Sequence, residues 1–536
     1  MPSSKVLLLV LAVAMGMLAI GQSASWDRSQ EDQADFRTGA SLRVPANRPG
    51  DPGQAGIYAA LPGVRAAAPA HRATSELSAD RTATVLALDT AQADERMLLR
   101  DDLSEPSGGN GAARLLDAVQ PPTTPKTSRV GVLLPEDTRR LRVTLRLTDT
   151  SARGGVSPTG SAPFTTVLVE DRYGIGYRLP AGEVPVDGRP HTVTLDLAGA
   201  ADSARGPGAA GTPLTPAGPL ALTGLELESS APQGESETHR VDVEALKSLD
   251  TDGAVRPVDV ADDFGWRATL VASLDGESDP DRPLKPVASS SAPLTFSYET
   301  GVSPRAGAYL DPTRRLTVHV GVPRPEPPAV LPAIATDTFL RAAGAKTGQS
   351  LDVEVAGDRL RVKIVRTVAQ LPTTGPGALS AQAASESADG GRTGDGGALL
   401  LDLRAVNEVL ADRREASLAP TEWWLSAAPG RAPEVAETLR ARSDVDPAQV
   451  MVREETAREL LSDPLGVGPQ SALLAAAIAA AALAAVGFAV SAAGGGRGRG
   501  APIAPVGARG TPPRPRPPRE CTQHGRRGGG ARQGGR

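Results

Sequence analysis

The stretch Leu141–Leu147, LRVTLRL, alternates apolar and polar side chains at every position. Because successive side chains of a β-strand point to opposite faces of the sheet, this alternation predicts a strand with one buried and one exposed face. Turn-forming residues separate it from four later segments of the same kind, Thr165–Val169, His191–Leu197, Leu220–Leu227 and Arg240–Val243. Repeated half-buried strands predict an antiparallel β-sandwich over residues 128–320, extended by Trp266–Ser273 and Leu294–Tyr298.

The segments on either side of this sandwich mix strand and helix patterns. The first, residues 26–120, continues from a polar helix into short strands such as Thr82–Leu88 and ends at the proline-rich QPPTTP, Gln120–Pro125. The second, residues 325–465, follows PRPEPP, Pro323–Pro328, and contains a predicted hairpin around Gly357-Asp358. A domain inserted at a surface loop is tolerated, so the two segments predict one interrupted α+β unit. Residues 373–397 read as a low-complexity loop.

Two apolar runs bracket this region. Ser471–Ala493 contains no charged residue and is long enough as a helix to span a bilayer, although a buried helix of a soluble protein is the alternative. Val6–Gly21 follows Lys5 and predicts either a retained helix or a cleaved signal peptide with a small-residue site at Ser23–Ser25. The sequence thus predicts transmembrane helices at 5–25 and 471–493 around an exported, membrane-anchored α+β ectodomain.

The charge is unevenly distributed along the chain. The tail 494–536 holds ten arginines and one acid, whereas subtracting the ends from totals of 57 basic and 62 acidic residues leaves the large region at about −15. This net charge argues against nucleic acid as a partner. The only cysteine, Cys521, lies in the tail, so the large region has no disulfide. The tail itself is rich in Gly, Pro and Arg and is predicted to be disordered.

No catalytic motif stands out in the sequence. It lacks a phosphate-binding loop, G-x-S-x-G, H-E-x-x-H and paired C-x-x-C, so we predict no enzyme activity, no cofactor and no catalytic or metal-binding residues. Asp259, Asp262 and Asp263 could ligate Ca²⁺, although a solvated turn is the simpler interpretation. Four histidines are scattered and fit surface or core roles: His71, His191, His239 and His319. The neighbours Trp423 and Trp424 face opposite sides of a strand, which predicts one in the core and one at a partner or membrane interface.

Two stretches carry a resemblance to a known family. Ile334–Thr373, IATDTFLRAAGAKTGQSLDVEVAGDRLRVKIVRTVAQLPT, and Leu399–Leu410, LLLDLRAVNEVL, resemble the periplasmic core domain of FtsX-like ABC transporter permeases. Trp26–Val44 and Thr421–Gly430 resemble the large actinobacterial members, which carry a sandwich inserted in the ectodomain. The family's later membrane helices have no counterpart after Ala493, which favours a truncation or a frameshift.

The resemblance implies a permease subunit, or a fragment of one, at the cell membrane with its large domain outside the cytoplasm. Its implied partners are an ABC ATPase subunit, another permease half or a second copy of the chain, and the lipid bilayer. The alternative is a membrane-anchored surface protein whose sandwich binds or adheres to an envelope partner. A secreted hydrolase is the least favoured interpretation because no nucleophile constellation is present.

Overall fold

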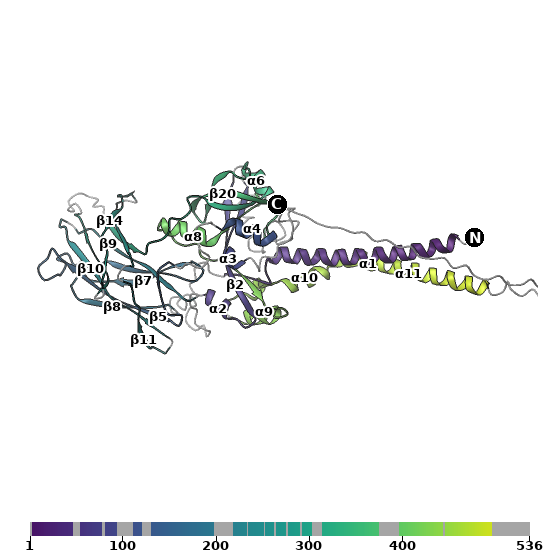
Figure 1. Cartoon of the computed structure of the whole chain (residues 1–536), viewed down its shortest axis with the longest axis horizontal. Helices are drawn as coiled ribbons and strands as arrows, with labels where there is room; N and C mark the ends of the chain where they lie inside the picture. The colour runs from purple at the N-terminus through teal and green to yellow at the C-terminus, as the bar shows by residue number, and fades with distance from the viewer. Residues whose placement is uncertain are drawn as a thin grey trace, which may run out of the picture. The chain divides into compact units, whose positions relative to one another are not determined.

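The structure is a computed structural model of the whole chain. It describes residues 3–46, 54–77, 81–93, 111–120, 130–197, 218–232, 234–250, 252–261, 264–274, 277–289, 292–302, 314–374, 396–442 and 445–495. Contacts divide the chain into one unit of residues 21–470 and another of residues 1–20 with 471–536. Figure 1 labels several of the helices and strands.

One nine-stranded sheet, the core sheet, takes its strands from both segments that flank the sandwich. The order is β19-β20-β18-β21-β3-β2-β22-β1-β23. The first segment supplies β1 (Leu42–Pro45), β2 (Val64–Glu76) and β3 (Thr82–Leu88). The second supplies β18 (Leu331–Thr336), β19 (Ser350–Val355), β20 (Asp358–Val368), β21 (Ala398–Asp402), β22 (Glu422–Ala427) and β23 (Met451–Val452). β18 pairs with β20 in parallel, as β21 does with β3, and the other pairs are antiparallel.

Helices cover both faces of the core sheet. On one face, side chains of α6 (Asp337–Ala343) and α8 (Leu403–Asp412) share a core with β3, β18 and β20, and those of α2 (Gln54–Ala60) and α9 (Ala432–Arg440) share one with β1 and β22. On the opposite face, α4 (Gly111–Val119) packs beside α3 (Thr90–Ala93). The remaining short helices are η2 (Pro447–Gln449) and α10 (Arg453–Leu461).

This two-sided cover corrects the prediction for the tryptophan pair. Trp423 and Trp424 do face opposite sides of β22, but they are only 2% and 0% exposed. Trp423 packs against Tyr58 and Tyr173, while Trp424 joins the core under α4. Because both faces of the sheet are covered, neither ring is available to a partner or a membrane interface.

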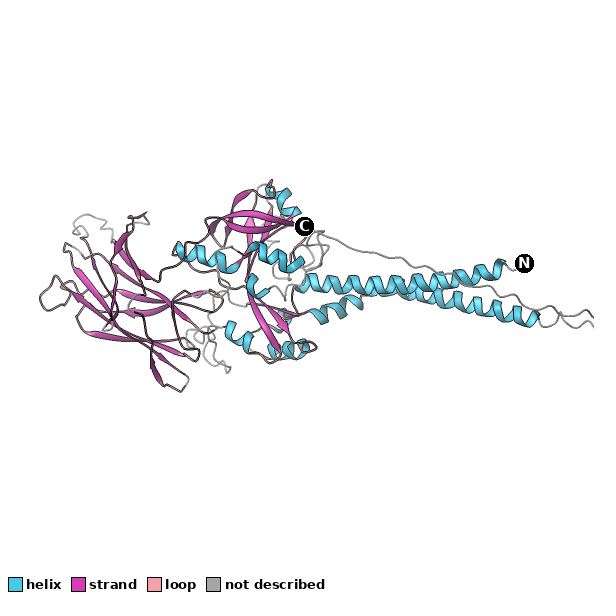
Figure 2. Ribbon diagram, viewed as in Figure 1, coloured by secondary structure: helices cyan, strands magenta, loops and turns pink. Residues whose placement is uncertain are grey.

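The region between the two segments is a sandwich of two antiparallel sheets. The six-stranded sheet runs β15-β16-β10-β5-β8 with β11 beside β10, and the eight-stranded sheet runs β13-β12-β17-β9-β6-β7 with β14 beside β12 and β4 beside β9. Figure 2 shows that the described part of this region is built of strands, whereas helices accompany the core sheet. Apolar residues of alternate positions from both sheets fill one core around Phe296 and Leu147. The strands run β4 (Val132–Leu133), β5 (Arg140–Asp149), β6 (Phe164–Glu170), β7 (Gly176–Glu183), β8 (Pro190–Asp196), β9 (Ala221–Ser230), β10 (Thr238–Leu249), β11 (Val255–Pro257), β12 (Arg267–Leu274), β13 (Glu277–Ser278), β14 (Arg282–Leu284), β15 (Val287–Ser289), β16 (Ala292–Glu299) and β17 (Arg315–Gly321).

The prediction of two transmembrane helices is wrong. The runs at 5–25 and 471–493 lie in α1 (Ser3–Thr38) and α11 (Pro464–Gly495), but no helix within the described residues combines the length and the apolar character that crossing a bilayer requires. The physical reason lies in their composition. Val6–Gly21 falls short of the ~20 apolar residues that a span needs, and the same helix continues into Asp27 and Arg28. The second run is mostly alanine, which is only weakly apolar.

Two predictions fall on residues that the structure leaves undescribed. Almost all of the low-complexity loop, residues 375–395, lies outside the described residues. The tail from residue 496 also lies outside them, and Gly494 and Gly495 belong to the end of α11.

Candidate functional site

The outer face of the eight-stranded sheet forms the floor of a cleft. Along β17, Leu316, Val318 and Val320 are buried in the sandwich core, so His319 and Gly321 point outward. The cross-strand partner of His319 on β9 is Glu226, and that of Gly321 is Gly224. Polar residues therefore follow one another across the strands on this face.

Helix α8 forms the wall of the cleft. Leu403, Val406 and Leu410 recur at three- and four-residue spacing and are buried against the core sheet. The same periodicity turns Arg404, Glu408 and Ala411 toward the sandwich, where they line the cleft with Asn407. Asp402 begins the helix by accepting a hydrogen bond from the Ala405 amide through Oδ1 at 2.8 Å. This N-cap fixes the residue at which α8, and with it the wall of the cleft, begins.

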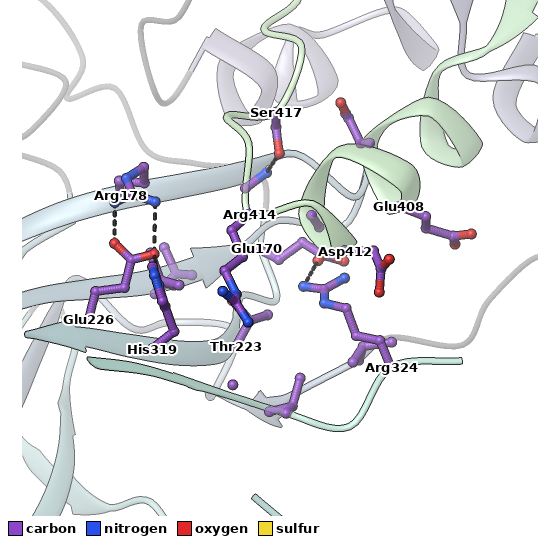
Figure 3. A pocket seen from close by; sticks show the side chains of 18 of the residues that line it. Glu170, Arg178, Thr223, Glu226, His319, Arg324, Glu408, Asp412, Arg414 and Ser417 are labelled. Atoms are coloured by element: carbon purple, nitrogen blue, oxygen red, sulfur yellow. Dashed lines mark hydrogen bonds and ion pairs between the residues drawn. The ribbon is translucent and has the colours of Figure 1, made fainter. Parts of the chain in front are cut away.

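Between floor and wall lies a cavity of about 400 Å³. This volume is in the range of clefts that hold small ligands. From the floor, the lining includes Arg178, Glu226, Arg267, His319 and Gly321, and from the wall side it includes Arg404, Asn407, Glu408, Asp412, Arg414 and Ser417. Figure 3 shows several of these side chains around the cavity.

The acids of the floor are held in ion pairs. Arg178 and His319 both reach the Glu226 carboxylate, with Arg178 Nη1–Oε1 at 2.9 Å and His319 Nδ1–Oε1 at 3.2 Å (Figure 3). Burial alone would raise the pKa of Glu226, but the hydrogen bond with His319 and the charge of Arg178 outweigh it and lower the pKa. Arg324 Nη2 pairs with Glu170 Oε2 at 2.7 Å. The Glu226 carboxylate is thus ionised and weakly basic.

Three hydrogen-bond donors of the cleft remain unused. Within the part of the chain that the structure describes, the side chain of Arg267 on β12 makes no hydrogen bond or ion pair. Asn407 is only 2% exposed, and its Nδ2 has no partner although its Oδ1 accepts from the Leu418 amide at 2.8 Å. Arg404 Nε is also buried and unpartnered. A buried donor without a partner costs about 1–3 kcal/mol, and this cost applies to Asn407 and Arg404, whereas the Arg267 side chain is exposed to solvent.

Direct contacts fix the wall against the floor. Ser417 Oγ accepts from the Gly176 amide at 3.1 Å, and Arg404 Nη2 donates to the Arg172 carbonyl at 2.9 Å. Arg414 donates to Thr269 Oγ1 at 3.1 Å and pairs with Asp281. Because these contacts join the sandwich to the α+β part on several sides, the cleft is preformed.

Three buried carboxylates lie at the junction behind the cleft. Asp171, in the β6–β7 turn, accepts from the Tyr173 and Ile175 amides and from the Tyr177 hydroxyl. Asp89 faces Arg404 at 3.7 Å, and Asp402 accepts from both the amide and the hydroxyl of Thr90. Burial raises the pKa of Asp171 to about 7 and that of Asp89 to about 6, in each case against opposing hydrogen bonds or the Arg404 charge. Burial also raises the pKa of Asp402.

The histidines singled out in the sequence do not gather. His71 Nδ1 lies 2.6 Å from the Ala419 carbonyl, and His191 pairs with Asp187 at 2.9 Å. His239 is fully buried in the sandwich between Glu237 at 2.6 Å and Tyr298 at 3.0 Å. Only His319 reaches the cleft.

Of the three candidate calcium ligands, the structure describes Asp259 alone. Asp259 is exposed, and Asp262 and Asp263 lie outside the described residues. Trp266 is 7% exposed and belongs to the sandwich core.

The sequence does not reveal the cleft, because the residues of its floor have the pattern of the exposed face of ordinary strands. No local pattern marks α8 as the helix that covers this face.

Comparison with known proteins identifies no relative: the chain matches no family model, no characterised protein and no solved structure.

Proposed function

We propose that this chain is a binding protein that holds a small polar ligand in the cleft between the sandwich and α8. The observation that carries the proposal is the cavity of about 400 Å³ between the two parts, whose lining includes the polar side chains of Arg178, Glu226, Arg267 and His319. Clefts between two packed parts of a protein, mostly preformed and with a few convergent polar groups, are preferred places for ligands.

We also propose that the chain acts by binding and not by catalysis. A general base works best with a pKa near the operating pH. Glu226 instead has a lowered pKa, held by His319 and Arg178. Ion-paired carboxylates of this kind suit recognition and rigidity more than proton transfer.

The test fills the cleft from its floor. A Cβ built on Gly321 meets only the Thr223 carbonyl, at 3.8 Å, so Gly321→Ile projects into the cavity without a backbone clash. Thr317→Ile is the matched control because it lies on the same outward face of β17 but does not line the cavity. Small polar compounds are first screened by the rise in melting temperature of the wild type. Calorimetric titration then compares the compounds that bind across the three proteins.

We expect Gly321→Ile to weaken binding of these compounds at least about tenfold, and Thr317→Ile to leave it unchanged, because only the first side chain occupies part of the cavity. Circular dichroism and urea unfolding check that both variants fold. Binding to Gly321→Ile with wild-type affinity, or a screen without any compound that binds, would contradict the proposal.

The transporter role stays a prediction. One observation favours it: the two stretches that carry the resemblance lie next to one another in the core sheet. They are Ile334–Thr373 and Leu399–Leu410, and β18 lies between β20 and β21. The second stretch includes most of α8, so the wall of the cleft belongs to the segment with the resemblance. Copurification with an ATPase encoded beside this chain would test the implied partner.

A further inference from the structure

We propose that the ligand of the cleft is an uncharged alcohol whose hydroxyl donates a hydrogen bond to His319 Nε2 and accepts one from Thr269. This inference rests on the proposed binding function and names the chemical class of its ligand. It follows from the ring nitrogen and the hydroxyl hydrogen that the protein leaves unused on two neighbouring side chains of the floor.

Glu226 decides which nitrogen of His319 is an acceptor. Nδ1 of the ring lies 3.2 Å from Glu226 Oε1. Burial opposes ionisation of this carboxylate, but the hydrogen bond with His319 and the charge of Arg178 lower its pKa. Because an ionised carboxylate only accepts hydrogen bonds, Nδ1 of the neutral ring carries the hydrogen, and Nε2 keeps its lone pair.

The Nε2 atom of His319 is within reach of a ligand. The His319 side chain is 22% exposed and lines the cavity, whereas the Glu226 side chain is 3% exposed. Among the described residues, Nε2 makes no hydrogen bond and is not one of the polar atoms sealed from solvent. Figure 3 shows His319 next to Glu226 on the floor of the cavity.

Thr269 supplies a donor beside this acceptor. It is the cross-strand partner of His319 on β12, so the Cβ atoms of the two residues lie about 5 Å apart. Ala268 and Leu270 are buried in the sandwich, which turns Thr269 outward to the cavity. Its Oγ1 accepts from Arg414 Nη2 at 3.1 Å, and its own hydrogen has no acceptor among the described residues. A ligand hydroxyl, which donates and accepts at one oxygen, complements this pair.

The surrounding charges disfavour an ionic group at this position. A carboxylate has no hydrogen to donate to His319 Nε2 and would lie near the Glu226 carboxylate. An ammonium group cannot accept from Thr269, and it would lie near the guanidinium groups of Arg178 and Arg414. An uncharged hydroxyl avoids both costs.

Two variants test the two contacts. Thr269→Val keeps the shape of the side chain and removes its hydroxyl, and His319→Phe keeps a planar ring without nitrogen. Thr317→Val is the matched control, because it makes the same exchange on the outward face of β17 without lining the cavity. Circular dichroism and urea unfolding check the fold, and Thr269→Val carries the test by itself if His319→Phe does not fold.

The probes are cyclohexanol, cyclohexylamine and cyclohexanecarboxylate, which share one ring and carry a hydroxyl, an ammonium or a carboxylate at pH 8. Calorimetry measures each probe against the wild type and the variants. We expect saturable binding of cyclohexanol, with the two charged probes at least about tenfold weaker. Thr269→Val should weaken cyclohexanol about three- to tenfold and His319→Phe about tenfold or more, while Thr317→Val changes it less than about twofold.

Nuclear magnetic resonance of the His319 ring nitrogens tests the acceptor directly. At pH 8 the hydrogen should reside on Nδ1, and the Nε2 resonance should shift when cyclohexanol binds. A hydrogen on Nε2, or on both nitrogens, would overturn the inference. Equal binding of the three probes, or unchanged cyclohexanol binding in Thr269→Val, would do the same.

The failure of this inference can be told from the failure of the binding function. If cyclohexanol does not bind but other compounds bind in a Gly321-dependent way, the alcohol inference fails and the binding function stands. If no compound depends on Gly321, the binding function itself fails.

Discussion

At the scale of single residues, the most consequential polar group of the core sheet is Glu422. Its carboxylate is buried on β22 and accepts from Arg72 Nη2 at 2.9 Å and from Trp424 Nε1 at 3.0 Å, with Arg43 at 3.9 Å. Burial by itself would raise the pKa of Glu422, but the charges of Arg72 and Arg43 outweigh it and bring the pKa to about 2. One carboxylate thus balances two arginines inside the fold.

Replacing Glu422 by Gln should lower the free energy of unfolding by about 3–5 kcal/mol, because it leaves the buried Arg43 and the partly buried Arg72 without a counter-charge. Urea denaturation at pH 7 measures the loss. Asp352→Asn is the control: Asp352 pairs with Arg361 at the surface, both side chains are about half exposed, and the change should stay within about 1 kcal/mol. Similar losses for both variants would show that burial does not govern these pairs.

At the scale of elements, α8 connects the stability of the fold to the shape of the cleft. Its cap Asp402 accepts from the Ala405 amide and also from Thr90, the first residue of α3, so one side chain joins α8 to the start of α3. The helix then carries Arg404 and Asn407 to the cavity. A change at the cap should therefore be felt in both stability and binding.

We expect Asp402→Ala to lower the free energy of unfolding by about 2–4 kcal/mol, since it removes a helix cap and leaves Thr90 buried without its acceptor. The control Asp446→Ala removes the cap of η2, whose Asp446 side chain bonds the Ala448 amide at an exposed site, and should cost about 1 kcal/mol or less. Thermal and urea unfolding compare the two. Compounds that bind the cleft should also bind Asp402→Ala more weakly, and unchanged binding would mean that the cap does not position the wall.

At the scale of the whole molecule, the junction between sandwich and core sheet should make stability depend on pH. Asp171 and Asp89 have their pKa values raised from 3.8 to about 7 and about 6 by burial. A carboxyl group whose pKa is raised in the folded state binds its proton more tightly there than in the unfolded chain. The stabilisation is therefore complete below pH 3.8 and is lost as the pH rises toward 7. Glu422, with its lowered pKa, acts in the opposite sense below about pH 4.5.

The free energy of unfolding should thus fall by on the order of a few kcal/mol between pH 4.5 and pH 7.5. Urea unfolding at several pH values measures this slope. Asp171→Asn mimics the protonated acid, because its oxygen can still accept from the Tyr173 and Ile175 amides, and it should flatten the profile. A wild-type profile that is flat, or that rises over this range, would contradict the assignment.

The sequence by itself determined the local elements of this protein. The alternation in LRVTLRL corresponds to β5, and the predicted strand Thr82–Leu88 and the predicted hairpin around Gly357-Asp358 are elements of the structure. Each of these depends on side-chain alternation or turn residues, which are written in a few consecutive positions. The pattern that breaks off before the sandwich and resumes after it also indicated which strands could share a sheet.

Only the tertiary structure decided what covers each face. The burial of both Trp423 and Trp424 depends on helices that lie on opposite sides of the core sheet, tens to hundreds of residues away in sequence. The cleft likewise depends on β17 and α8, which are distant in sequence and meet only in the folded chain. The prediction that the two apolar runs span a membrane was wrong because it depended on the absence of charge. Length and apolar character together decide whether a helix can span a bilayer. A period of side chains reports which face of an element is apolar, but the partner of that face is chosen by the packing of the whole chain.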